Sequence, residues 1–131
     1  MNLIAKQDGN IVIFELEGHL DFETTQRFQE HCKGLYKANK EQRIVLNMEK
    51  LRFVGSSGIN QFVRILKSFN SQDAKPKFCR VSSDFLKVFR AYQTSRNPFE
   101  VFEDEVQAKV AFDLPPPPKR ASSKKLKEIE N

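Results

Sequence analysis

Two adjacent hydroxyl side chains, Ser56 and Ser57, stand between Gly55 and Gly58, and this spacing is the feature of the sequence that most suggests chemistry. A serine hydroxyl can act as a nucleophile, cap a helix or accept a phosphoryl group. The segment follows an apolar run and precedes apolar residues at helical spacing, so we expect it at a strand-to-helix junction. The plainest interpretation is that Ser56 or Ser57 caps the helix that starts near Ile59.

Two enzymatic interpretations of this segment fit poorly. A nucleophilic serine at such a junction needs Gly-x-Ser-x-Gly, and the spacing here is one residue short. The bases available to it would be His19 and His31, and neither has an evident role. A phosphate-binding loop needs Lys followed by Ser or Thr after its second glycine, where this chain has Ile59-Asn60. We therefore expect a protein that is not an enzyme.

RNA binding is a further alternative, because the KH module clamps nucleotides with a Gly-x-x-Gly loop. A KH loop joins two helices, whereas this one follows an apolar strand, and the charged residues form no basic stripe. The net charge is +5, but residues 115–131 hold five basic and two acidic residues, which leaves +2 for residues 1–114. We expect no nucleic-acid partner and keep KH-like binding as the third hypothesis.

The remaining reactive residues indicate no cofactor and no metal site. Cys32 and Cys79 lack metal-ligand spacing and are expected to be reduced thiols. No apolar stretch approaches the ~18–20 residues of a membrane-spanning helix. The first ten residues lack the basic flank and apolar region of a secretory signal. We expect a cytoplasmic protein that does not insert into a membrane.

The elements around the serines follow from turn residues and apolar periodicity. Asp8-Gly9-Asn10 predicts a turn between strands at Asn2–Lys6 and Ile11–Glu17. Asp21 or Thr24 is expected to cap a helix. Further strands are predicted at Arg43–Asn47, Phe78–Val81 and Phe99–Phe102. The predicted helix faces are Phe28, Cys32 and Leu35; Ile59, Phe62, Val63, Leu66 and Phe69; Phe85, Val88, Phe89 and Tyr92 after a cap at Ser82, Ser83 or Asp84; and Val106, Val110 and Ala111 after Asp104.

The predicted order is β-β-α-β-α-β-α-β-α, an α/β fold. Strands that alternate with helices favour a mixed, mostly parallel sheet, to which the N-terminal hairpin adds an antiparallel edge, with about four flanking helices. The four prolines of 115–118 cannot continue a helix, and the residues beyond them are basic with almost no apolar content. We therefore predict one domain at residues 1–114 and a disordered tail at residues 115–131.

Three segments together resemble the STAS domain, specifically the anti-sigma-factor antagonists of the SpoIIAA and RsbV kind. Leu16–Phe22 is similar to the family's strand that ends in Gly-x-Leu/Ile-Asp. Ile44–Ile59 resembles the family's segment in which an apolar strand leads to Asp-Ser-Ser-Gly. Phe85–Phe89 is similar to the helix after the family's fourth strand. The resemblance covers roughly residues 1–114 and agrees with the predicted order of elements.

The resemblance implies a phosphorylation-controlled switch in the cytoplasm. In this family an anti-sigma factor with serine-kinase activity phosphorylates the first serine of the motif, and the unphosphorylated protein binds that factor. The corresponding residue is Ser56, with Ser57 as the second candidate, and Gly55 replaces the family's Asp. Some STAS domains instead act as phosphorylation-independent subunits of signalling or transport complexes. The resemblance implies a partner surface made by Asp21, Gly55, Ser56, Ser57, Gly58 and Ile59.

Overall fold

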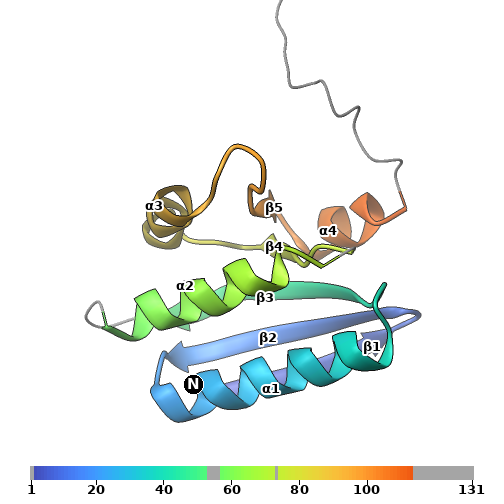
Figure 1. Cartoon of the computed structure of the whole chain (residues 1–131), viewed down its shortest axis with the longest axis horizontal. Helices are drawn as coiled ribbons and strands as arrows, with labels where there is room; N and C mark the ends of the chain where they lie inside the picture. The colour runs from blue at the N-terminus through green and yellow to red at the C-terminus, as the bar shows by residue number, and fades with distance from the viewer. Residues whose placement is uncertain (1, 53–56, 73, 114–131) are drawn as a thin grey trace, which may run out of the picture.

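The computed structural model describes residues 2–52, 57–72 and 74–113. These residues form one five-stranded sheet with the strand order β1-β2-β3-β4-β5 and four helices (Figure 1). The first pair of strands is antiparallel and the others are parallel, which confirms the predicted mixed α/β fold. The elements are β1 (Asn2–Asp8), β2 (Ile11–His19), α1 (Phe22–Ala38), β3 (Arg43–Arg52), α2 (Ser57–Phe69), β4 (Lys77–Cys79), α3 (Ser83–Tyr92), β5 (Glu100–Phe102) and α4 (Glu105–Ala111).

The predicted hairpin is confirmed. Gly9 has a φ of 61°, a left-handed conformation that glycine adopts without steric cost, and Asp8 pairs with Ile11 across the turn. Strand β2 runs two residues farther than predicted, to His19, beside β3. Gly18, near the end of β2, has a φ of 88°, and the register between β2 and β3 shifts between Glu15 and Glu17. Glycine therefore permits the irregular end of this strand.

The sheet is buried on both faces where β2 and β3 lie side by side. Phe14 and Leu46 face a large core that α1, α2 and α3 cover. Ile13 and Val45 face a smaller core that Ala108 of α4 closes. The continuous apolar run of β3 thus has the burial that its sequence predicts for a strand covered on both sides.

Helix α2 carries the apolar face that the sequence predicts. Ile59, Phe62, Val63, Leu66 and Phe69 are all buried in the large core. Phe62 is fully buried, with ring centroids 5.8 Å from Phe28 and 6.3 Å from Phe85. Burial of one such side chain contributes about 1.5–3 kcal/mol. These contacts fix α2 against both neighbouring helices and hence fix the position of its first turn.

Three helices begin at side-chain caps, as the sequence predicts. The carboxylate of Asp21 accepts from the Thr24 amide at 2.7 Å, and that of Asp104 accepts from the Gln107 amide at 2.9 Å. Of the three candidates for α3, Ser82 is the cap, because its hydroxyl accepts from the Phe85 amide at 3.3 Å. Each cap satisfies an amide at the first turn that has no partner within the helix.

Several predicted boundaries and one predicted helix face are wrong. Strand β3 continues past Asn47 to Arg52 because Met48 and Leu51 point into the core. Strand β4 covers Lys77–Cys79 instead of 78–81, and β5 begins at Glu100. On α4, Val106 and Val110 are exposed, and the contact with the sheet is made by Ala108 and Phe112. A small residue at 108 lets the short helix approach the sheet closely.

Candidate protein-binding site at the carboxyl edge of the sheet

The carboxyl ends of the parallel strands place the two sequence motifs side by side. His19 at the end of β2 is in register with Arg52 at the end of β3. The next amide, that of Leu20, donates to the Arg52 carbonyl at 3.0 Å. Figure 1 shows α1 and α2 starting at this same end of the molecule. In open α/β sheets, ligand sites lie at this edge.

The central residues of the predicted site, Gly55 and Ser56, lie outside the described residues. Helix α2 begins at Ser57, immediately after them. Gly55 therefore lies between the strand β3 and the helix α2 in the chain, and Gly58 belongs to the helix. A KH loop joins two helices, so this connection differs from that of a KH loop.

Asp21 holds the loop between β2 and α1 in place. Its carboxylate accepts from the Thr24 amide at 2.7 Å and from the Thr24 hydroxyl at 3.1 Å. The hydroxyl of Thr25 donates to the Asp21 carbonyl at 2.6 Å, and both threonines are buried. The predicted capping role is confirmed, and this network orients the start of α1 beside the end of β3.

Gly58 and Ile59 form the first turn of α2. Gly58 lies inside the helix with no left-handed φ, so the entry into the helix does not depend on a special conformation there. A Cβ atom at Gly58 would stand 3.9 Å from the Cβ of Leu20, an ordinary van der Waals distance. Ile59 is 4% exposed and packs in the large core. Both residues therefore position this edge, and the side chain of Ile59 offers little surface to a partner.

An exposed aromatic ring stands at this edge and is absent from the residues that the sequence singles out. Phe22, the first residue of α1, is 64% exposed. Asn60 on α2 is also exposed, and its side chain accepts from the Tyr92 hydroxyl at 2.8 Å, which ties α3 to the same region. Phe22 lies off the apolar stripe of Phe28 and Cys32, and that mismatch is the signal by which sequence reasoning could have found it.

Cationic residues end the neighbouring strands. Arg52 at the end of β3 and Arg80 just after β4 are exposed, and so is His19. Arg80 has a φ of 55°, a conformation that costs a side-chain-bearing residue about 1–2 kcal/mol. The first turn of α2 contains no acidic residue. The start of α2 itself thus favours a nearby negative charge.

The other reactive residues do not form a site with this edge. His31 is exposed on α1, with its ring 5.1 Å from that of Phe14 in an edge-to-face arrangement. Burial raises the pKa of the Cys32 thiol to about 12. Burial also raises the pKa of the Cys79 thiol to about 12, with a smaller contribution from the negative charge of Glu105. Within the described ranges, no three His, Cys, Asp or Glu residues could hold a metal ion, and no helix is long and apolar enough to cross a membrane.

Comparison with known proteins identifies the fold family. The anti-sigma factor antagonist SpoIIAA in its unphosphorylated form superposes with a TM-score of 0.62 at 16% identity, covering 84% of this chain and 96% of that one. The Bacillus cell fate determinant SpoIIAA in its phosphorylated form gives 0.61 at 18% identity, covering 83% and 99%. The murine anion transporter Solute Carrier 26 family member A9 gives 0.60 at 11% identity, covering 82% of this chain and 18% of the transporter. The family profile described as STAS domain matches residues 2–108, and the chain belongs to the STAS domain family.

Proposed function

We propose that this chain is a cytoplasmic, non-enzymatic protein-binding switch of the anti-sigma-factor-antagonist type. Its partner would be an anti-sigma factor with serine-kinase activity, which phosphorylates Ser56 and binds the unphosphorylated chain. The observation that carries the proposal is the hydrogen bond from Leu20 to Arg52, which joins the capped loop of Asp21 to the last residue before residues 53–58, the serine segment. The fold shared with SpoIIAA supports the same conclusion.

The charges around the start of α2 suit a phosphate on Ser56. A helix N-terminus carries unpaired amides and about half a positive charge, and here no acid in the first turn competes for them. A phosphate adds about −1.5 to −2 charge at neutral pH. The packed first turn, with Ile59 in the core, gives no reason for the fold to change on phosphorylation.

Partner binding would respond to that charge because an apolar group stands at the same edge. A partner that covers Phe22 must remove the water around this ring. A phosphate close to the ring would then lose part of its hydration, and that loss would oppose binding. A difference of only ~3 kcal/mol would weaken binding about a hundredfold. Gly55 removes the acid that the family carries before the serine, so the unphosphorylated segment has one negative charge fewer.

Phosphorylation of the purified chain by candidate kinases with ATP tests this function, with the phosphate located by mass spectrometry. The proposal expects phosphate on Ser56, loss of labelling in Ser56→Ala, retained labelling in Ser57→Ala, and weak partner binding by Ser56→Asp. Labelling of Ser57 in place of Ser56 would contradict the assignment of the acceptor.

A second candidate is a phosphorylation-independent interaction subunit of a signalling or transport complex. Gly55 favours it, because the residue before the acceptor departs from the family pattern. This candidate expects no phosphate with any kinase and full partner binding by Ser56→Asp. The two candidates therefore give opposite results in the same pair of experiments.

A further inference from the structure

A pocket of about 380 Å³ lies between the C-terminal ends of α1 and α2. Both helices start at the carboxyl edge of the sheet, so their last turns and this pocket lie at the other end, away from the first turn of α2 (Figure 1). Its volume is within the range of about 300–1,000 Å³ that is usual for small-molecule sites. The lining residues are Lys33, Tyr36, Lys37, Lys40, Phe69, Ser71 and Gln72.

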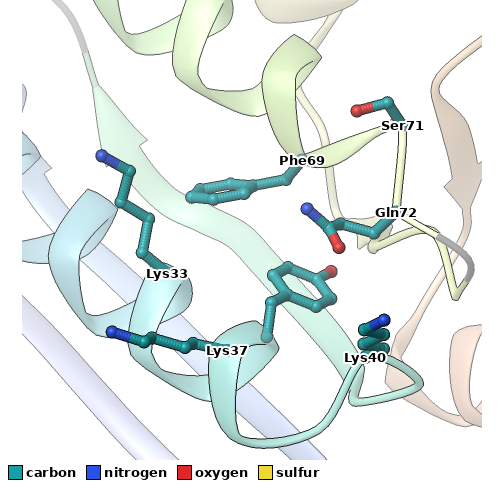
Figure 2. Close-up of a pocket in the computed structure, with 7 residues that line it drawn as sticks. Lys33, Lys37, Lys40, Phe69, Ser71 and Gln72 are labelled. Atoms are coloured by element: carbon teal, nitrogen blue, oxygen red, sulfur yellow. The ribbon is translucent and has the colours of Figure 1, made fainter.

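The pocket is strongly cationic. Figure 2 shows Lys33, Lys37 and Lys40 on the α1 side and Phe69, Ser71 and Gln72 on the α2 side. The three lysines are exposed, and none has an ion-pair partner within the described part of the chain. Lys6, Lys50, Lys77 and Lys109, by contrast, are each paired with a carboxylate.

Neither helix end cancels this charge. The C-terminus of a helix carries about −0.5 charge, so α1 and α2 together contribute about −1 against three lysine charges. Among the described residues the lining contains no carboxylate; Asp73, which follows Gln72, lies outside them. The pocket therefore favours a ligand with at least two negative charges.

The rest of the lining suits a molecule with a phosphate group and an apolar part. The rings of Tyr36 and Phe69 lie 5.6 Å apart, tilted by 37°, and form an apolar floor. The Ser71 hydroxyl donates to the Ser68 carbonyl at 2.8 Å, which leaves its oxygen as an acceptor. Gln72 adds an amide, and lysine is a common point-charge ligand for phosphate.

From this combination we propose that the pocket binds a small phosphorylated molecule carrying two or more negative charges. The lysines hold the phosphate groups and the Tyr36–Phe69 floor receives the apolar part. The site is separate from the serine segment, so Ser56→Asp should leave it intact.

Titration of the isotope-labelled full chain with pyrophosphate, at constant ionic strength, tests the proposal by the backbone amide shifts of Lys37, Lys40 and Gln72. We expect saturable shifts, at least about tenfold weaker binding in Lys33→Gln/Lys37→Gln, and no change in the matched Lys67→Gln/Lys87→Gln variant, whose two lysines are exposed and outside the pocket. Circular dichroism checks that each variant is folded.

Shifts that do not saturate, or equal weakening in both double variants, would overturn the proposal, because both indicate general electrostatic attraction. An acidic peptide that saturates these amides where pyrophosphate does not would also overturn it, in favour of a protein-binding role. Because the residues observed lie at the far end of α1 and α2 from their first turns, failure here and failure of the proposed switch are distinguishable.

Discussion

The amide of Leu20 donates to the carbonyl of Arg52 at 3.0 Å, and this bond joins the β2–α1 loop to the end of β3. Leu20 precedes the cap of α1, and Arg52 is the last described residue before the serine segment. The Cβ of Leu20 also faces Gly58 in the first turn of α2. A change that loosens the β2–α1 loop should therefore weaken the binding of a partner at the serine segment.

The cap of α1 provides the first test of this coupling. Asp21→Ala removes the carboxylate that accepts from Thr24 and should lower the free energy of unfolding by about 0.5–2 kcal/mol, measured by urea denaturation. It should also weaken partner binding, measured by calorimetry. Asp104→Ala is the matched control, because it removes a cap of the same type from α4 on the other face of the sheet. Equal binding losses in the two variants would show that Asp21 acts through general stability alone.

The exposed ring of Phe22 provides the second test. Phe22→Ala should change the free energy of unfolding by no more than about 0.5 kcal/mol, because the ring is 64% exposed. If the ring is an anchor for the partner, the same change should weaken binding by about 2 kcal/mol or more. Val106→Ala, at a residue that is 63% exposed on α4, is the control and should leave binding unchanged. Partner binding that survives Phe22→Ala would exclude this ring from the interface.

The buried thiols give a prediction on pH. Burial raises the pKa of Cys32 to about 12, so at pH 8 only about one thiol in ten thousand is a reactive thiolate. A thiol-exchange reagent at pH 8 should react with neither Cys32 nor Cys79 in the folded chain and with both in urea. Because these pKa values are raised above about 9, the thiols stabilise the fold below that pH and lose this contribution as the pH rises toward 12. Rapid reaction of the folded chain would show that a cysteine is accessible.

The sequence predicts the elements well where a helix face or a cap is regular. All five apolar residues of α2 share one stripe, and the caps Asp21 and Asp104 stand directly before their helices. Prediction from the sequence fails where tertiary packing determines the length of a strand or the buried face of a helix. The charges of Glu49 and Lys50 interrupt the apolar run of β3, yet the strand continues because β2 pairs with it to the end. Likewise, the close approach of Ala108 to the sheet, and not the larger valines, sets the face of α4.

The candidate site is only partly predictable. The sequence locates the two loops that the sheet brings together, but their adjacency depends on the register of β2 with β3, which local patterns do not encode. Phe22 was missed because helix prediction follows the apolar stripe, and only the departure of Phe22 from the stripe of Phe28 and Cys32 marks the ring as exposed. The boundary between residues 1–114 and the tail at 115–131 stays a prediction.

The central claim is that phosphate on Ser56 controls partner binding, and one affinity comparison tests it most directly. The dissociation constant of the anti-sigma-factor kinase is measured for the unphosphorylated chain and for the chain fully phosphorylated at Ser56. The switch predicts about hundredfold weaker binding after phosphorylation, with an unchanged circular dichroism spectrum. Equal affinity of the two forms would contradict it.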